Sequence, residues 1–378
     1  TGVDSRILGT SDVPTDDRTC RISGTAPNAP QRISARDRVE RVLTRGGIQG
    51  FRVGLSGYDV RKHPWYPWAD LIQLHWINGL VGLPDLRRID KPLIWTLRDM
   101  WPMTGGCHYA MSCQRYSSGC GSCPMLGARH EKDLSFWLAR AKRNALPAHT
   151  HIAPISRWLT RCAEQSYVLR DRPTHYIPNV VDTERFAPKD KQRARAELGL
   201  PLGRPIVLTG ALRGTDPYKG VALFAEALQH LRSSPLIVTF GKNAEPSDTE
   251  SAPWHAFGLV EDDAKLATIY SAADVFVNSS VQEAFGKTLV EAMLCETPVV
   301  AFDGTGPSDI VSHLETGYLA ESMDAKSLAS GIDWILNQDG ASLGTAARMR
   351  ALKYFAPSVV AGQYKALYRK VLANTPGI

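Results

Sequence analysis

Short apolar runs alternate with helical patterns along most of the chain, and this alternation constrains the fold more than any other sequence feature. In the second half the runs cover residues 206–211, 236–241, 256–260, 275–278 and 298–302, with helical patterns at 221–231 and 263–272. The first half repeats the alternation at 71–75, 93–97, 152–155 and 175–177. Val- and Ile-rich strands separated by helices are typical of a parallel, doubly wound sheet. The sequence therefore predicts an α/β fold.

The chain has 378 residues, enough for two domains of ordinary size. The segment IPNVVDTERFAP, residues 177–188, is a plausible hinge, whereas the polar, Pro-rich residues 11–36 are predicted to be loop. Open α/β sheets bind ligands outside the carboxyl ends of their strands, so we expect a ligand cleft between the two domains. No apolar run approaches the roughly 20 residues that a membrane-spanning helix needs.

Charge is distributed unevenly along the chain. Residues 1–180 contain 25 Lys and Arg against 15 Asp and Glu, a net charge of +10; the remainder contains 19 against 23, a net charge of −4, and the two give the +6 of the whole chain. A basic half suits an anionic partner such as a phosphate-bearing substrate, a membrane surface or a nucleic acid. An ordinary solvated surface explains the charge equally well. No helix-turn-helix or RNA-binding signature supports nucleic acid, which we exclude.

Two cations lie on a predicted strand-to-helix loop. The strand at 206–211 continues into LRGTDPYKG, which places Arg213 and Lys219 before the next helix. Free backbone N–H groups at a helix start, together with two cations, suit a diphosphate. The loop lacks the Walker pattern, and solvated surface charges remain the alternative interpretation.

Two glutamates stand eight positions apart in VQEAFGKTLVEAM, residues 281–293. Glu283 lies in the loop that feeds a buried helix, and Glu291 lies within that helix. Carboxylate oxygens accept hydrogen bonds from vicinal hydroxyls, so this loop beside the phosphate loop predicts a nucleotide-sugar pocket. The alternatives are a helix-terminal charge for Glu283 and a salt-bridged core residue for Glu291. Backbone amides at the same loop mouth belong to Phe285, Gly286, Lys287 and Thr288.

These motifs resemble the retaining nucleotide-sugar glycosyltransferases of the GT-B fold, family four. The resemblance rests on DPYKG, SSVQEAFGKTLVEAM, YSAADVFVNSS, TPVVAFD and IPNVVDTERF, although Val180 stands where that family usually has Gly. LHWING and TLRDMWPMTGGCHY are similar to a subgroup of bacterial exopolysaccharide and capsule transferases. The resemblance covers nearly the whole chain from Asp70 onward. It implies two Rossmann-like domains facing a cleft, and the family's first strand and helix have no counterpart, so we expect the natural protein to begin earlier.

The resemblance also implies an organisation and an activity. Residues 1–180 would form an acceptor-binding domain, 181–355 a donor-binding domain, and 356–378 a helix packing back toward the first domain. The enzyme would move a sugar from a nucleotide-diphosphate sugar to a glycan or lipid-linked acceptor in cell-surface polysaccharide synthesis. It would work in the cytoplasm, free or peripheral at the inner membrane face. The alternatives are an inverting transferase, a sugar-nucleotide epimerase or a non-catalytic nucleotide-sugar-binding protein.

Site roles follow from the resemblance position by position. Glu291 would hold the ribose hydroxyls, and Glu283 with the amides after it would hold the donor sugar. Arg213 and Lys219 would neutralise the diphosphate leaving group. In such enzymes the leaving phosphate is thought to take the acceptor's proton, so no protein nucleophile and no catalytic metal are expected; catalysis is then positioning plus charge stabilisation.

The acceptor side departs from the family pattern. Many relatives carry His-Asp where this chain has Arg98 and Asp99. Arg98 stays protonated and cannot act as a base, but it suits a phosphate or an anionic acceptor. Asp99 either orients the acceptor hydroxyl or caps a turn. His75, in company with Trp76 and Asn78, is predicted to bind the acceptor, with a structural histidine as the alternative.

Four of the seven cysteines fall in one Gly-rich stretch. Cys107, Cys113, Cys120 and Cys123 suit a tetrahedral structural zinc, with His108 as a substitute ligand. Free thiols or a redox-formed bridge are the alternatives. The other cysteines, Cys20, Cys162 and Cys295, are expected to be isolated, buried thiols.

Basic and apolar residues mix between positions 32 and 45. A basic cluster there, with Val39, Val42 and Leu43 interspersed, suits an interfacial helix on anionic headgroups. The alternative is a surface helix that packs its apolar side chains inward. The basic residues are Arg32, Arg36, Arg38, Arg41 and Arg45.

Overall fold

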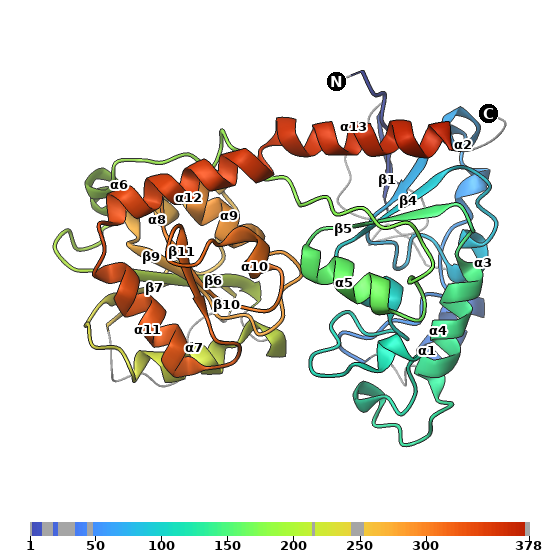
Figure 1. Ribbon diagram of the computed structural model, residues 1–378, viewed down its shortest axis with the longest axis horizontal. Helices are drawn as coiled ribbons and strands as arrows, with labels where there is room; N and C mark the ends of the chain where they lie inside the picture. The colour runs from blue at the N-terminus through green and yellow to red at the C-terminus, as the bar shows by residue number, and fades with distance from the viewer. Residues whose placement is uncertain are drawn as a thin grey trace. The chain divides into compact units, whose positions relative to one another are not determined.

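The computed structural model describes residues 2–9, 18–21, 35–43, 48–213, 216–242 and 253–374. The chain divides into two compact units, whose elements are labelled in Figure 1. Unit 1 comprises Thr1–Pro154, Leu159–Tyr176 and Tyr364–Ile378, and unit 2 comprises Ile155–Trp158 and Ile177–Gln363. The last helix, α13 (Pro357–Ala373), therefore starts in unit 2 and continues into unit 1 from Tyr364 onward.

Unit 2 is built on a parallel sheet whose described strands follow the order β11-β10-β9-β6-β7-β8. The strands are β6 Ile206–Arg213, β7 Leu236–Lys242, β8 Trp254–Ala256, β9 Val275–Asn278, β10 Val299–Phe302 and β11 Gly317–Ala320. The helices are α6 Lys191–Glu197, α7 Val221–Leu228, α8 Asp263–Ala272, α9 Lys287–Leu294, α10 Pro307–Ile310, α11 Ala325–Leu336 and α12 Gly340–Phe355. Because the order starts in the middle and moves outward to both edges, the sheet is doubly wound, as predicted.

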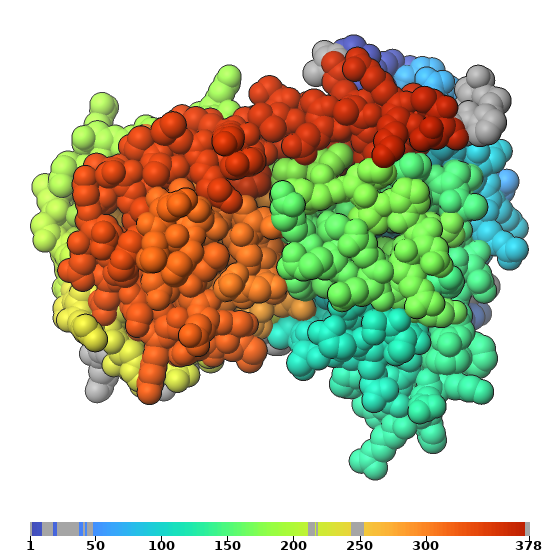
Figure 2. Space-filling view, in the orientation of Figure 1, coloured from blue at the N-terminus to red at the C-terminus, as the bar shows by residue number. Residues whose placement is uncertain are grey.

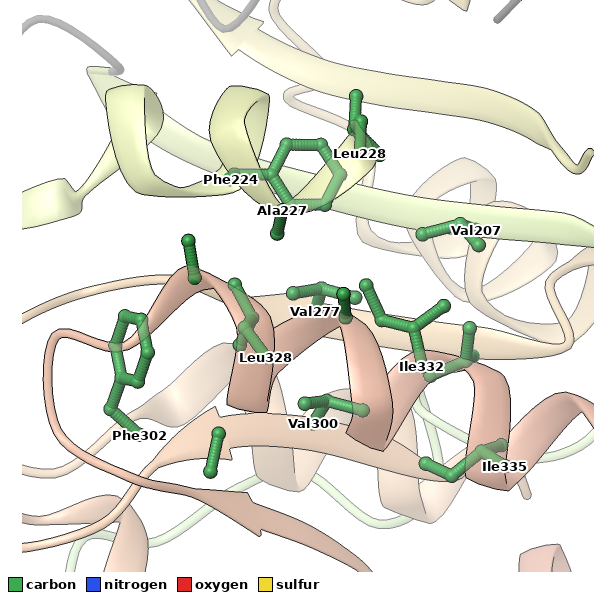
Figure 3. Packing of buried hydrophobic residues seen from close by; sticks show 14 of the residues in the cluster. Val207, Phe224, Ala227, Leu228, Val277, Val300, Phe302, Leu328, Ile332 and Ile335 are labelled. Atoms are coloured by element: carbon green, nitrogen blue, oxygen red, sulfur yellow. The ribbon is translucent and has the colours of Figure 1, made fainter. Parts of the chain in front are cut away.

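Helices cover both faces of this sheet. On one face, side chains of α7 and α11 pack against alternate residues of the strands, as Figure 3 shows for Phe224, Leu328 and Val277. Because successive strand residues point to opposite faces, Phe276 lies on the other face, where its ring is 5.4 Å from that of Tyr270 on α8. Helices α11 and α12 form much of the outer surface of unit 2 on the side seen in Figure 2. The carboxyl ends of the strands are thereby left to loops.

Unit 1 has a smaller sheet. Within the described residues, the parallel strands β3, β4 and β5 pair in that order, and β1 and β2 form a separate parallel pair. The strands are β1 Ile7–Gly9, β2 Thr19–Arg21, β3 Ile72–Leu74, β4 Leu93–Leu97 and β5 Thr150–Pro154. The helices are α1 Ala35–Leu43, α2 Trp65–Trp68, α3 Leu83–Leu86, α4 Leu134–Ala145 and α5 Arg157–Gln165.

The second half of α13 is tied to this sheet by hydrogen bonds. The Tyr364 hydroxyl lies 3.3 Å from Thr96 Oγ1 on β4. The Tyr368 hydroxyl donates to Gln73 Oε1 on β3, and Gln73 Nε2 donates to Thr96 Oγ1 over 2.8 Å. Polar side chains on β3 and β4 are thus satisfied by the C-terminal helix.

Several predicted strands need correction. Residues 256–260 are not a strand, because β8 ends at Ala256. Residues 175–177 form no strand; the preceding Thr174 makes an isolated bridge with Ile152 of β5, and the His175 N–H donates to Ile152 O over 2.8 Å. Residues 19–21, predicted as loop, form β2 through their pairing with β1, and the sequence patterns did not identify β11. In the described part of the chain, no helix is both long and apolar enough to cross a membrane.

Candidate active site

The first candidate loop follows β6. Arg213 is the last residue of that strand; its side chain and residues 214 and 215 lie outside the described structure. The chain then forms a 3-10 turn, Pro217–Lys219, and Gly220 leads into α7. Lys219 Nζ lies 2.8 Å from Glu283 Oε2, and both side chains are mostly buried. The structure therefore brings together two residues that are 64 positions apart in the sequence and that were both predicted to bind the donor.

The second loop joins β9 to α9 and is bonded to the first. The Val281 N–H donates to Tyr218 O over 2.8 Å, and Ser279 Oγ donates to Lys219 O over 3.0 Å. A Cβ at Gly220 would lie 1.9 Å from Ser279 O, and the φ of Gly220 is +64°. Only glycine fits this close approach, because it lacks the side chain and tolerates positive φ. The two loops consequently form one surface.

The start of α9 supplies the amides predicted from the sequence. Gly286 is the residue before the helix, with a φ of +104°, and the first helical residues are Lys287 and Thr288. The first N–H groups of a helix have no intrahelical acceptor, so they favour an anion or a hydroxyl oxygen. Phe285 is buried, and its ring packs 5.4 Å from that of Phe355. The packing of Phe285 therefore fixes the loop that precedes the first residues of α9.

Glu291 is buried within α9 and already has protein partners. Lys287 Nζ lies 3.1 Å from Glu291 Oε1, and the Tyr270 hydroxyl donates to Oε2 over 3.1 Å. Burial first, and the Glu291 charge second, raise the pKa of Tyr270 well above its ordinary value, so the phenol keeps its proton. Each carboxylate oxygen retains a further lone pair. Both interpretations of Glu291, ribose ligand and salt-bridged core residue, are compatible with these contacts.

A third loop, not identified from the sequence, joins the same surface. It follows β10 as Gly304, Thr305 and Gly306, and the Gly306 N–H donates to Glu283 O over 2.9 Å. A Cβ at Gly306 would lie 2.7 Å from the backbone of Glu283 and Ala284. Thr305 Oγ1 is buried and has no hydrogen-bond partner among the described residues. The available signal was the Gly-Thr-Gly-Pro that follows the strand predicted at 298–302.

In unit 1, polar side chains gather after β3 and β4. Arg98 Nη2 lies 3.3 Å from His75 Nδ1. Burial first, and the Arg98 charge second, lower the pKa of His75 to about 4. Trp76 is 61% exposed. Asn78, in contrast, has a side-chain amide that is buried without a partner among the described residues.

Asp99 has two hydrogen-bond partners. Its Oδ1 accepts the Trp101 N–H over 2.9 Å, which is the predicted turn cap. Its Oδ2 lies 2.7 Å from His108 Nδ1, and the Trp76 ring packs against His108 edge-on, with the centroids 5.7 Å apart. Sequence analysis treated His108 only as a substitute metal ligand. The structure places it in contact with two of the predicted acceptor-side residues, Trp76 and Asp99.

The four clustered cysteines line one small cavity of about 20 Å³, together with Phe51 and glycines of the same loop. All are free thiols. Among the residues that the structure describes, no group of three or more His, Cys, Asp and Glu is arranged to hold a metal ion, so the predicted zinc site finds no support. The Nδ1 of its substitute ligand, His108, is hydrogen-bonded to Asp99 instead. Cys162 and Cys295 are buried as predicted, whereas Cys20 is half-buried.

The basic segment near the start of the chain is described only in part. Arg32 and Arg45 lie outside the described residues, as do the side chains of Arg36 and Arg41, while Arg38 is exposed on α1. The inward packing considered for this helix is not observed, because Val39, Val42 and Leu43 are all exposed. Glu40 instead ties α1 to the next loop by accepting the Gly54 and Ser56 N–H groups, each over 3.2 Å.

Part of the chain matches a known protein family, and most of it is similar to curated enzymes. Residues 203–338 match the family described as "Glycosyl transferases group 1". The chain is 28% identical over 334 residues to D-inositol 3-phosphate glycosyltransferase of Nocardia farcinica, covering 80% of this chain and 65% of the relative. It is 29% identical over 266 residues to alpha-maltose-1-phosphate synthase of Mycolicibacterium smegmatis, covering 64% and 67%. The chain thus spans about two thirds of the length of these curated relatives.

Solved structures show the same architecture. Sucrose-phosphate synthase from Thermosynechococcus elongatus matches with a TM-score of 0.68 at 23% identity, covering 97% of this chain and 86% of that one. Anabaena HepE in complex with UDP and glucose matches with a TM-score of 0.59 at 18% identity, covering 80% and 78%. The predicted fold class is confirmed: this is a GT-B fold. Its second unit carries a segment that matches the group 1 glycosyl transferases.

Proposed function

We propose that this protein is a retaining glycosyltransferase that moves a sugar from a nucleoside diphosphate to a hydroxyl group of an anionic acceptor. The Lys219–Glu283 contact carries this proposal. It places a cation and a carboxylate 2.8 Å apart, beside the N-terminus of α9 and after the carboxyl ends of β6 and β9. Ligands of doubly wound sheets bind at this edge.

Each part of this surface suits one part of the donor. The Lys219 ammonium favours the diphosphate, on which charge develops as it leaves. Glu283 and the amides at the start of α9 accept from and donate to the sugar hydroxyls. Glu291, one turn further along α9, is the residue for the ribose hydroxyls. Two matched structures of one protein support the donor class, since HepE was solved with UDP and glucose and with UDP-glucose.

The chemistry requires no protein nucleophile. The bond between the sugar's anomeric carbon and the diphosphate oxygen breaks, and a bond to the acceptor oxygen forms on the same face. The acceptor's proton passes to the departing diphosphate, so charge and atoms balance. The protein's contribution is to hold the two substrates and to stabilise the leaving charge.

The acceptor class rests on unit 1. Residues 1–180 carry a net charge of +10, and Arg98 stands after β4 with an exposed Trp76 near it. The names of several relatives contain a phosphorylated compound, among them D-inositol 3-phosphate. An anionic acceptor is therefore proposed, either a phosphorylated sugar or polyol, or a glycan on a lipid diphosphate in cell-surface polysaccharide synthesis. The exposed apolar side chains of α1 would support the second source through peripheral membrane contact.

The test is a transfer screen with the full chain. UDP- and GDP-sugars are each combined with D-inositol 3-phosphate, with phosphorylated hexoses and with a lipid-diphosphate-linked glycan in vesicles. The expected product retains the anomeric configuration of the donor by NMR, with one nucleoside diphosphate released per transfer. An inverted product would overturn the retaining stereochemistry, and an epimerised donor would indicate an epimerase. Donor binding without transfer or hydrolysis would leave a non-catalytic binding protein.

A further inference from the structure

The hydrogen-bonding state of His108 follows from its contact with Asp99. A carboxylate only accepts hydrogen bonds, so the proton on the 2.7 Å contact belongs to His108 Nδ1. The Trp101 N–H fixes the other carboxylate oxygen. The imidazole is therefore held in one orientation, with Nε2 directed away from Asp99. In the described part of the chain, no group hydrogen-bonds to this Nε2, and the His108 side chain is 13% exposed.

The loop that carries His108 is held at both ends of the residue. Its N–H donates to Gly50 O over 2.9 Å, and its carbonyl accepts the Met100 N–H over 2.9 Å. Between Asp99 and His108, the buried Lys142 Nζ donates to Trp101 O over 2.5 Å and to Thr104 O over 3.0 Å. A side chain on such a fixed loop meets a ligand without reorganisation.

The surroundings of Nε2 indicate the chemistry of a ligand. Trp76 is 61% exposed beside the imidazole and offers an aromatic face to the apolar side of a sugar or polyol ring. Arg98 precedes Asp99 in the sequence, its Nη2 lies 3.3 Å from His75 Nδ1, and its guanidinium matches a phosphate or carboxylate. An unpaired ring nitrogen, an exposed indole and a guanidinium together fit a hydroxylated ring that bears an anion.

We propose that His108 is the acceptor-positioning contact of this enzyme: Nε2 accepts a hydrogen bond from the hydroxyl that receives the sugar, with Trp76 against the acceptor ring and Arg98 on its anionic group. Asp99 acts through His108, by fixing its tautomer and orientation, and is a positioning residue. This inference rests on the proposed function and adds the acceptor contact to it.

Two substitutions at one position separate this role from a structural one. His108→Asn keeps a nitrogen donor near the place of Nδ1 and removes Nε2, so the contact with Asp99 survives. His108→Gln places an amide near Nε2 and gives up the Nδ1 contact. His130→Gln is the matched control, because His130 is an exposed histidine of the same unit.

The measurement is kcat/KM for the best acceptor of the transfer screen, with donor affinity and Tm for each variant. We expect His108→Asn to lower kcat/KM for the acceptor about 10²-fold, with donor affinity and Tm equal to those of His130→Gln. His108→Gln should retain more activity than His108→Asn. Asp99→Asn should lower kcat/KM, and adding it to His108→Asn should cost little more, because the two act as one unit.

Two outcomes would overturn the inference. One is a His108→Asn variant with the acceptor kcat/KM of the wild type. The other is a loss in His108→Asn that is matched by a loss of folded protein and of donor affinity. Either result leaves the proposed function standing, because the wild type then transfers sugar. A wild-type protein that neither transfers nor hydrolyses any donor refutes the proposed function itself.

Discussion

At the scale of single residues, Glu291 illustrates how a buried carboxylate obtains partners for both of its oxygens. It is only 4% exposed, and an unpaired carboxylate at such depth is costly. Lys287 Nζ on one oxygen and the Tyr270 hydroxyl on the other offset that cost. Lys287 remains largely exposed and can move when a ligand arrives, whereas Tyr270 is fully buried and fixed. Tyr270 therefore sets the position of the carboxylate.

Replacing Tyr270 by Phe should reveal this role. The change leaves the ring packing and removes the hydroxyl that bonds to Glu291, so we expect the free energy of unfolding to fall by about 1.5–3 kcal/mol. Nucleoside diphosphate affinity should weaken as well, if Glu291 holds the ribose. Urea unfolding and calorimetric titration measure the two effects, with the exposed Tyr354→Phe as the control. Equal stability of the two variants would argue against the assigned contact.

Some contacts between single residues could be predicted from the sequence, and others could not. The proximity of Lys219 and Glu283 was predictable because each stands in a strand-to-helix loop, and parallel strands bring such loops to one edge. The Asp99–His108 contact was not identified, because the chain between them is irregular and carries no periodicity. Thr305 was missed for a related reason: its significance lies in being buried without a partner, which is a property of packing.

At the scale of elements, the proposed donor surface consists of the loops after β6, β9 and β10, and it depends on how closely these loops approach one another. Gly220, at a φ of +64°, allows the first loop to lie against Ser279 of the second. Gly306 does the same between the third loop and Glu283. The three loops are therefore in direct contact, and a substitution that displaces one of them should displace the others.

Two glycines distinguish the cost of a steric clash from the cost of placing a side chain on backbone with positive φ. Gly199 has a φ of +68° with nothing within 4 Å of its Cβ position, whereas a Cβ at Gly220 would lie 1.9 Å from Ser279 O. Gly199→Ala should therefore cost about 1–2 kcal/mol, the backbone cost alone. We expect Gly220→Ala to cost clearly more and to weaken donor binding, as measured by urea unfolding and titration. Equal costs for both variants would contradict the close packing of the two loops.

The strand predictions were correct where the strand's own sequence is a continuous apolar run. Val275–Asn278 and Leu93–Leu97 are fully buried and were predicted to the residue. The edge strands β8 and β11 were misplaced or missed, because their few residues become strand only by pairing with β7 and β10. β2 is likewise defined by β1. Pairing is a tertiary property, so local patterns do not report it.

At the scale of the whole molecule, a pair of stacked histidines in unit 1 links stability to pH. His175 Nε2 lies 3.0 Å from His151 Nδ1, and the two rings stack. Burial first, then the charge of Lys370 and the neighbouring His151, lower the pKa of His175 to about 4. The pKa of His151 is lowered as well, by burial, Lys370 and His149. Protonation of this pair is therefore opposed by the fold.

Because the pKa of His175 is lower in the fold than in the unfolded chain, the free energy of unfolding should fall as the pH is lowered. In the unfolded chain a histidine binds its proton near pH 6.5, whereas in the fold His175 does so only near pH 4. The unfolded state binds more protons in this interval, so the contribution to stability is complete above about pH 6.5 and is lost as the pH falls toward 4. Urea unfolding at several pH values measures it, and His175→Gln should flatten the profile. An unchanged profile in that variant would contradict the assignment.

We propose that Lys219 and Glu283 form the donor site, and a transfer assay on variants of both residues tests this proposal. Lys191 and Asp274 provide the control, because their contact of 2.9 Å involves Asp274 before β9, at the opposite end of the strands. In a transfer assay, Lys219→Met and Glu283→Gln should each lower kcat/KM for the nucleotide sugar about 10²-fold or more, while Lys191→Met keeps the wild-type value. Wild-type kcat/KM in both site variants, or an equal loss in Lys191→Met, would contradict the account.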